Sequence, residues 1–250
     1  DTDGSSGGTI SSDDYNNGEI IRNTSWHHVV VTRKYGRFSG IWHDGLLIGG
    51  ADNGHGTRTI AGKRVELGFN RFDSGDYPFK GVMDEVRISK VARYGNIDIP
   101  TAPLSTSQNA GRGQNVLLSH HTKLLVQANS STTTSTTLAD QTGNHVATVY
   151  GDPAHVQTSS LSWANTAIYF DGDDNINFPA SSDFEIWDDD FSIECWFKDN
   201  TTGNGDMELV SYWASGTNYW NLMSRRAGGD ELRFGSIHGG TSSYVLSYSA

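Results

Sequence analysis

The chain has 250 residues, a formal net charge of −11, and 35% apolar against 19% charged residues. This acidic balance argues against nucleic acid as a partner, because phosphate recognition depends on clustered Lys and Arg. No run of 18 apolar residues occurs, so we expect no membrane insertion. The 29 glycines and many aromatic residues are typical of short strands joined by turns.

The first clear strands lie between residues 26 and 48. Trp26–Arg33 is β-branched and alternating, and it predicts a strand. Phe38–His43 and Leu46–Ile48 flank Asp44-Gly45, a residue pair that favours a hairpin turn. Arg64–Phe69 is the next predicted strand, and a weaker one is expected at Glu19–Arg22.

Residues 79–94 predict a strand followed by one short helix. Ser89 is a suitable N-cap for that helix, and Gly95 follows Tyr94 as its stop. Strict alternation would divide the strand into two faces, with Val82, Asp84, Val86 and Ile88 on one and Met83, Glu85 and Arg87 on the other. Asp84 then needs a partner among apolar neighbours, whereas Glu85 is expected to be solvated.

The second part of the chain contains regularly spaced short strands. Residues 95–114 hold two of the five prolines and show no periodicity, so they predict a linker. Phe191–Lys198 alternates, with Phe191, Ile193, Cys195 and Phe197 on one face. Further strands are predicted within Val116–Ala128 and at Val146–Tyr150, Ala167–Asp171, Ile176–Pro179, Met207–Trp213, Tyr219–Ser224, Glu231–Ser236 and Tyr244–Tyr248. This spacing predicts an all-β sandwich or barrel.

Several motifs together resemble a known family. W-H-H-V-V-V-T-R (26–33), W-H-D-G (42–45), L-G-F-N (67–70) and F-K-G-V-M-D-E-V-R-I-S (79–89) resemble the second half of a laminin-G-like, concanavalin A-like jelly roll. D-Q-T-G-N-H (140–145), Y-F-D-G-D-D-N-I-N-F-P (169–179) and D-F-S-I-E-C-W-F-K (190–198) resemble its first half. The resemblance implies an antiparallel jelly-roll β-sandwich.

The two halves of this resemblance occur in swapped order. The leading interpretation is a window from a tandem array, in which residues 1–105 close one jelly roll, residues 106–114 link, and residues 115–250 open the next. The alternatives are one permuted domain, or two truncated copies in a larger protein. A tandem window would leave strand edges unpaired, so we expect contacts with neighbouring repeats or copies of the chain.

The resemblance also implies a structural calcium ion. Relatives with this sandwich bind it through the aspartate of the D-E-V-R-I strand and carbonyls near the F-D-G turn. Carried over by position, the ligands are Asp84 and Gly172, with Asp171 and Asp140. The alternative is that Asp84 accepts hydrogen bonds from backbone amides or from an arginine.

Catalysis is not expected from these residues. The Glu-x-Asp-x-x-Glu pattern of glycanases with this fold is absent, Glu194 is the only carboxylate within its strand, and the histidines have no zinc-like spacing. Trp213, Tyr219 and Trp220 surround the loop at residues 214–218, so they form a candidate sugar platform.

The expected function is therefore that of a non-catalytic, extracellular structural and adhesive module. It would lie on a cell surface or virion, and cell-surface glycans are possible partners. The alternatives are a lectin module with a specific saccharide site and, behind it, a glycan hydrolase.

Overall fold

The computed structural model describes the strands and most turns of the chain. The described residues are 25–34, 39–51, 64–69, 71–72, 75–93, 99–105, 119–128, 138–158, 161, 166–186, 189–200, 205–215, 218–225, 231–238 and 241–249. The expected strand at Glu19–Arg22 and the expected linker at residues 106–114 lie outside them. Among the described residues, no helix is both long and apolar enough to cross a membrane.

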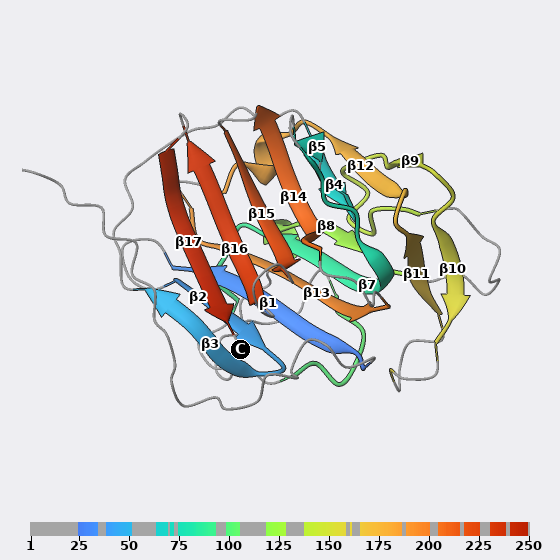
Figure 1. Cartoon of the computed structure of the whole chain (residues 1–250), viewed down its shortest axis with the longest axis horizontal. Helices are drawn as coiled ribbons and strands as arrows, with labels where there is room; N and C mark the ends of the chain where they lie inside the picture. Colours follow the sequence, from blue (N-terminus) through green and yellow to red (C-terminus); the bar gives the residue numbers. More distant parts are fainter. Residues whose placement is uncertain are drawn as a thin grey trace, which may run out of the picture.

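The chain folds into two antiparallel sheets stacked as a sandwich (Figure 1). Sheet A has the strand order β10-β11-β7-β13-β1-β2-β3, with β8 also paired to β7. Its strands are β1 (His27–Arg33), β2 (Ser39–His43), β3 (Leu46–Ala51), β7 (Lys80–Ser89), β8 (Thr122–Val126), β10 (Ala154–Gln157), β11 (Thr166–Asp171) and β13 (Phe191–Asp199). The predicted jelly-roll class, an all-β antiparallel sandwich, is confirmed.

Sheet B has the strand order β17-β16-β15-β14-β4-β12-β9. Its strands are β4 (Arg64–Leu67), β9 (Thr148–Tyr150), β12 (Asn175–Pro179), β14 (Met207–Ser215), β15 (Asn218–Arg225), β16 (Glu231–His238) and β17 (Thr241–Ser249). A small ribbon of β5 (Arg71–Phe72) and β6 (Gly75–Asp76) and two 3-10 turns, Ser119–His121 and Ser182–Phe184, complete the described elements.

Strands from both sides of the expected linker alternate within each sheet. In sheet A, β7 lies between β11 and β13, and β13 lies between β7 and β1. In sheet B, β4 lies between β14 and β12. The two segments therefore complete one sandwich in this chain, which is the pairing that a permuted domain requires. The division into successive repeats of a longer protein stays a prediction.

The core between the sheets follows the predicted alternation along β13. Phe191, Ile193, Cys195 and Phe197 all belong to one buried cluster, shared with side chains such as Leu67 of sheet B. Trp196 points the other way, into a smaller cluster with Trp26 and Val82. In a strand without a bulge, the residues that face the core can thus be predicted from the two-residue alternation alone.

The predicted faces of β7 were wrong, because the strand contains a bulge. Arg87 pairs with Glu194 but Asp84 pairs with Trp196, so β7 has one residue more than β13 between these pairs. Glu85 supplies it with a φ of 56°, in the left-handed region. Before this bulge the pattern is inverted relative to the predicted one: Met83 faces the core, as Val86 does after the bulge, whereas Val82 lies on the outer side.

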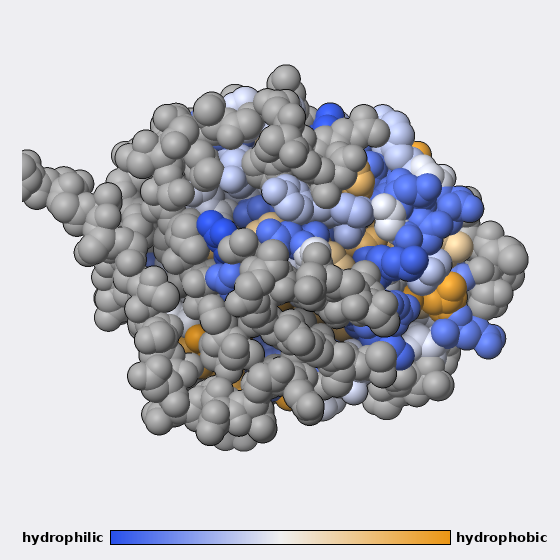
Figure 2. Space-filling view, in the orientation of Figure 1, coloured by the Kyte–Doolittle hydropathy of each residue, from blue (hydrophilic) through white to orange (hydrophobic). Residues whose placement is uncertain are grey.

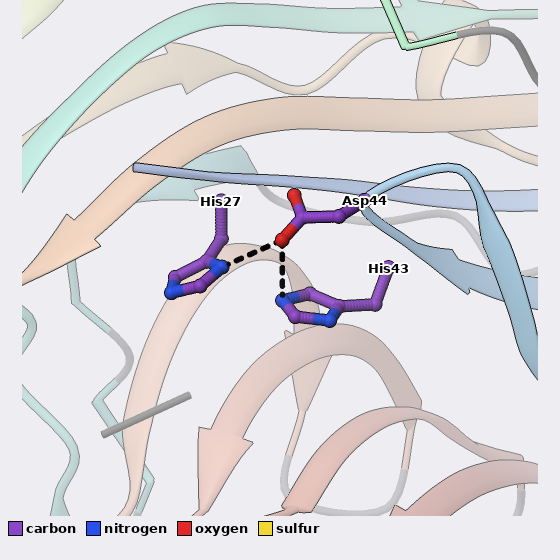
Figure 3. Close-up of side chains that lie close together, drawn as sticks. All are labelled: His27, His43 and Asp44. Carbon is purple, nitrogen blue, oxygen red and sulfur yellow. Dashed lines mark hydrogen bonds and ion pairs between the residues drawn. The ribbon is translucent and has the colours of Figure 1, made fainter. Parts of the chain in front are cut away.

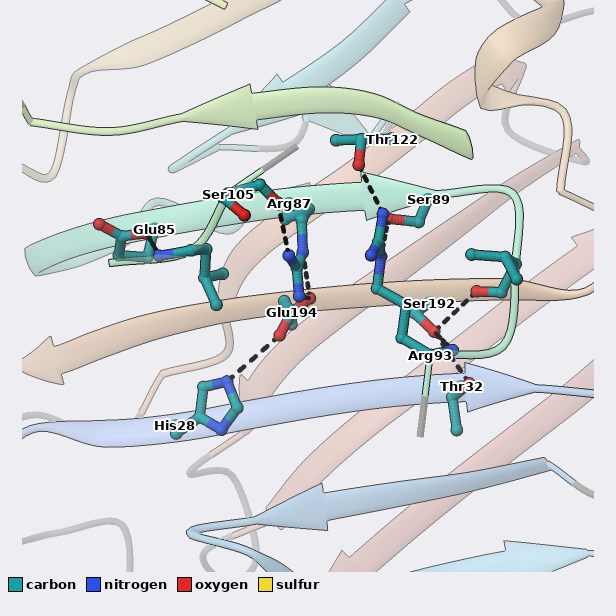
Figure 4. A network of polar contacts seen from close by, with 12 residues as sticks. His28, Thr32, Glu85, Arg87, Ser89, Arg93, Ser105, Thr122, Ser192 and Glu194 are labelled. Atoms are coloured by element: carbon teal, nitrogen blue, oxygen red, sulfur yellow. Dashed lines mark hydrogen bonds and ion pairs between the residues drawn. The ribbon is translucent and has the colours of Figure 1, made fainter. Parts of the chain in front are cut away.

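The expected short helix after β7 was also wrong. Ser89 is the last residue of the strand; residues 90 and 91 form a bend, and residues 92 and 93 have no regular structure. The Ser89 hydroxyl accepts a hydrogen bond from Arg93 Nε at 2.7 Å, and Arg93 Nη2 donates to Thr122 Oγ1 at 2.5 Å (Figure 4). The serine binds a buried arginine that ties β7 to β8, so it does not cap a helix. Tyr94 lies outside the described residues.

Candidate functional site

Two rows of polar and aromatic side chains lie on the outer face of sheet B. They alternate with core positions such as Val65, Tyr212 and Trp220. The first row runs across the sheet through Arg64, Trp213 and Tyr219, which are neighbours by register. The second row, by the same register, runs through Glu66, Ser211, Asn221 and Gly235. Hydrophilic residues predominate among the described residues on the face of the molecule seen in Figure 2.

The first row is half-buried and has the chemistry of a sugar platform. The Arg64 guanidinium lies over the Trp213 ring, 5.7 Å from its centroid. Tyr219 is paired directly with Trp213 across the strands, and burial raises the pKa of its phenol. Two of the three predicted aromatic residues therefore lie together on one face, next to a cation.

Trp220 does not belong to this platform. Its side chain is fully buried between the sheets, stacked on Tyr212 with 5.8 Å between ring centroids, and its Nε1 donates to Phe184 O at 3.3 Å. Neighbouring residues of a strand face opposite sides, so Tyr219 and Trp220 cannot both face solvent. The prediction that Trp220 contacts a sugar was wrong for this reason.

The second row is covered. Glu66 is 1% exposed and accepts a hydrogen bond from Arg64 Nε at 2.7 Å. Asn221 of this row donates through Nδ2 to the fully buried Glu208 at 2.5 Å. Each carboxylate has one oxygen bonded to a neighbouring donor and is almost completely buried, so neither faces solvent in this structure.

The predicted calcium ligands are not brought together as a set. Asp84 Oδ1 accepts hydrogen bonds from the backbone amides of Glu85 and Ala128, both at 2.8 Å. This matches the alternative in which backbone amides bind the aspartate. Burial raises the pKa of Asp84 to about 6, an effect opposed by the two amides.

Asp140 organises a turn next to β8. Its carboxylate accepts hydrogen bonds from the amides of Leu125, Thr142 and His145 at 2.9 to 3.1 Å, and from the Thr142 hydroxyl at 2.5 Å. Four donors occupy its oxygens, so its present geometry serves the turn.

Asp171 and Gly172 lie elsewhere, at the end of β11. Oxygens of Asp152, Asp171, Asp173 and Asp174 lie within 4.8 Å of one another there. Gly172 has a φ of 107°, which few other residues tolerate. Asp174 is buried and accepts hydrogen bonds from the amides of Asp152 and Asp171. The neighbouring Asp171 raises the pKa of Asp173. Of the predicted ligands, only Asp171 and Gly172 belong to this acidic turn.

A buried polar network covers the outer side of sheet A (Figure 4). Arg87 donates through Nε to Glu194 Oε1 at 2.5 Å and through Nη1 to Ser105 O at 2.8 Å. His28 Nε2 lies 3.5 Å from the other oxygen of Glu194. Glu194 is fully buried. It has no partner carboxylate within its strand, and its ion-pair partner, Arg87, comes from the other segment of the chain.

Glu85 belongs to the same side of the sheet and is not solvated, contrary to the prediction. It is 3% exposed, and its Oε2 accepts from Leu104 N at 2.6 Å and from Gln127 Nε2 at 2.8 Å. Burial is the main reason that its pKa is raised to about 7, and the neighbouring Asp84 raises it further.

Comparison with known families agrees with the fold. Residues 4–95 match the family model described as the concanavalin A-like lectin/glucanases superfamily, of laminin G type. This match supports the family resemblance that the sequence motifs indicate. The concanavalin A-like match spans β1 to β7 and ends before the second segment, so the swapped order of the halves stays a prediction. No curated protein and no solved structure matches the chain significantly.

Lectins and glucanases share the description of the superfamily. The match therefore leaves both binding and hydrolysis open, and the choice between them depends on the site residues of this chain.

Proposed function

We propose that the chain is a non-catalytic, extracellular module with a structural and adhesive role on a cell surface or virion. One observation carries the proposal: three glutamates of the sheets, Glu66, Glu194 and Glu208, are buried and bonded to neighbours. Glu194 pairs with Arg87, Glu66 with Arg64, and Glu208 with Asn221. A glycan hydrolase needs two carboxyl groups that face a substrate across a cleft.

The sheet edges support assembly with copies of the chain or with neighbouring repeats. β3 is an edge strand of sheet A, and its Leu46 and Leu47 are 48% and 46% exposed. β9 is an edge strand of sheet B, where Tyr150 is 49% exposed and the nearby Val146 is 80% exposed. Exposed edges with apolar side chains are suited to strand pairing between molecules.

Sedimentation velocity over a wide concentration range tests this assembly. We expect the mean mass to rise with concentration, and Tyr150→Lys to reduce the rise because a charge on an edge strand disfavours pairing. Lys198→Arg, which preserves charge on a central strand, is the control. A monomer at every concentration would contradict the structural role.

Glycan binding is the second candidate, favoured by the Trp213–Tyr219 pair beside Arg64. An aromatic face buries the apolar face of a sugar ring, and the guanidinium donates to hydroxyl groups. We expect specific glycan-array signals that fall at least about tenfold in Trp213→Ala, since an aromatic contact of roughly 1.5 kcal/mol corresponds to that factor. Tyr150→Ala removes an exposed aromatic from a distant strand and should retain binding. Equal binding by both variants would exclude this platform.

The calcium proposal is now restricted to the acidic turn around Asp171. A bound ion would relieve the repulsion among Asp171, Asp173 and Asp174, since calcium takes several oxygen ligands. We expect EDTA to lower the melting temperature of the chain and added calcium to restore it, and Asp173→Asn to weaken both effects. Asp84→Asn should leave both effects unchanged. A melting temperature that is the same with and without EDTA would contradict calcium binding at this turn.

A further inference from the structure

Three side chains that commonly bind metals converge at the turn between β2 and β3 (Figure 3). His27 begins β1, His43 ends β2, and Asp44 is the first residue of the turn. His27 Nδ1 lies 2.8 Å and His43 Nε2 lies 3.5 Å from the same oxygen, Asp44 Oδ2. One ligand atom from each residue lies within 4.8 Å of the other two.

The turn itself holds the carboxylate in place. Asp44 and Gly45 have φ values of 48° and 82°, as a tight hairpin turn requires. Asp44 N donates to His28 O at 2.8 Å, and Asp44 Oδ1 accepts from His28 N at 2.7 Å. The backbone of β1 therefore uses one carboxylate oxygen, and the other points toward the two imidazoles.

The two imidazoles of the site are almost completely buried, whereas the carboxylate is partly exposed. The side chains of His27 and His43 are 5% and 4% exposed, whereas that of Asp44 is 35% exposed. The two imidazole centroids are 4.8 Å apart, and the His27 ring also packs against Phe197. Within the described structure, His43 Nε2 is buried and makes no hydrogen bond. Such an atom costs free energy unless something binds it.

We propose that His27, His43 and Asp44 together bind one divalent transition-metal ion, with zinc as the best match. Two imidazole nitrogens and one carboxylate oxygen suit zinc and its neighbours in the first row, whereas calcium and magnesium prefer oxygen ligands. Ligand atoms about 2.1 Å from a tetrahedral ion lie roughly 3.4 Å apart, so small side-chain rotations complete the site.

Three protein ligands would leave a fourth tetrahedral position, which an exchangeable water or an outside ligand would fill. The ion would fasten the beginning of β1 to the β2–β3 turn. This site differs from the acidic turn around Asp171 in donor chemistry and in position, so the two proposals stand or fall separately.

Zinc titration of the metal-free full chain by calorimetry tests the proposal, with cobalt absorption as a second readout of the coordination. We expect one high-affinity site per chain and a rise in melting temperature with zinc but not with magnesium. Asp44→Asn removes a carboxylate oxygen yet tolerates the positive φ, and it should weaken zinc binding at least about tenfold, as should His43→Gln.

The adjacent surface pair His120 and His121, whose ring centroids are 4.0 Å apart, provides the matched control. The double variant His120→Ala/His121→Ala should retain the site in full. Circular dichroism tests whether each variant is folded. If His43→Gln unfolds, the zinc affinity of Asp44→Asn alone tests the proposal. Absence of zinc binding, wild-type affinity in Asp44→Asn, or loss of binding in the double variant would each overturn the proposal.

Discussion

Arg87→Met is expected to lower the free energy of unfolding by about 3–5 kcal/mol, because it leaves the buried Glu194 carboxylate without its cationic partner. Both side chains are at most 1% exposed, and methionine preserves much of the volume of the arginine stem. His28, 3.5 Å from the other carboxylate oxygen, is too distant for a full hydrogen bond. Denaturant unfolding followed by tryptophan fluorescence measures the loss.

Lys90→Met is the matched control for this prediction. Lys90 forms an ion pair of 3.3 Å with Asp189, but these side chains are 22% and 54% exposed. Exposed pairs contribute less than about 1 kcal/mol, so this variant should remain close to wild type. Replacing both buried partners, in Arg87→Met/Glu194→Leu, should restore most of the lost free energy of unfolding. A similar small effect for Arg87→Met and Lys90→Met would contradict the assigned role of the buried pair.

Glu85→Gln should stabilise the protein above neutral pH, by about 3 kcal/mol at pH 8. The folded-state pKa of Glu85 is about 7 against an ordinary value of 4.5, and each unit of difference corresponds to about 1.4 kcal/mol. The folded state therefore binds more protons than the unfolded state between these values. Stability from this group consequently falls as pH rises from about 4.5 to 7. Asp84, with a pKa of about 6, adds a slope of the same sign at slightly lower pH.

Urea unfolding at pH 4 and at pH 8 tests the direction of this pH dependence of stability. The glutamine oxygen is able to accept the hydrogen bonds from Leu104 N and Gln127 Nε2, so the variant loses the ionisation but not the contacts. At pH 4, where Glu85 is already protonated, wild type and Glu85→Gln should have similar stability. Equal stability of the two proteins at pH 8 would refute the raised pKa.

Strand positions and the alternation of β13 were predictable from the sequence, because period two needs only local information. Period two failed for β7 at Glu85, where a glutamate occupies a left-handed conformation in which glycine is the usual residue. Nothing in the run V-M-D-E-V-R marks that extra residue. The bulge became visible only when the pairing with β13 was known.

The sites were harder to predict than the strands, since they depend on register between distant segments. The error at Trp220 was avoidable, because its neighbour Tyr219 already occupies the opposite face of the strand. The grouping of His27 with His43 and Asp44 was not predicted, since the histidines show no metal-like spacing along the chain. The available signal was the Asp44-Gly45 turn, whose pairing with β1 brings Asp44 to His28 and hence to its neighbour His27.

The alternation of early and late strands also constrains how the chain folds during synthesis. Ser89 of β7 pairs with Ser192 of β13, and Val65 of β4 pairs with Tyr212 of β14. The early strands emerge from the ribosome well before these partners exist, so sheet A cannot close until synthesis has passed β13. Such distant pairing predicts slow folding and a long interval in which apolar strands are exposed, a period when chaperones would be needed.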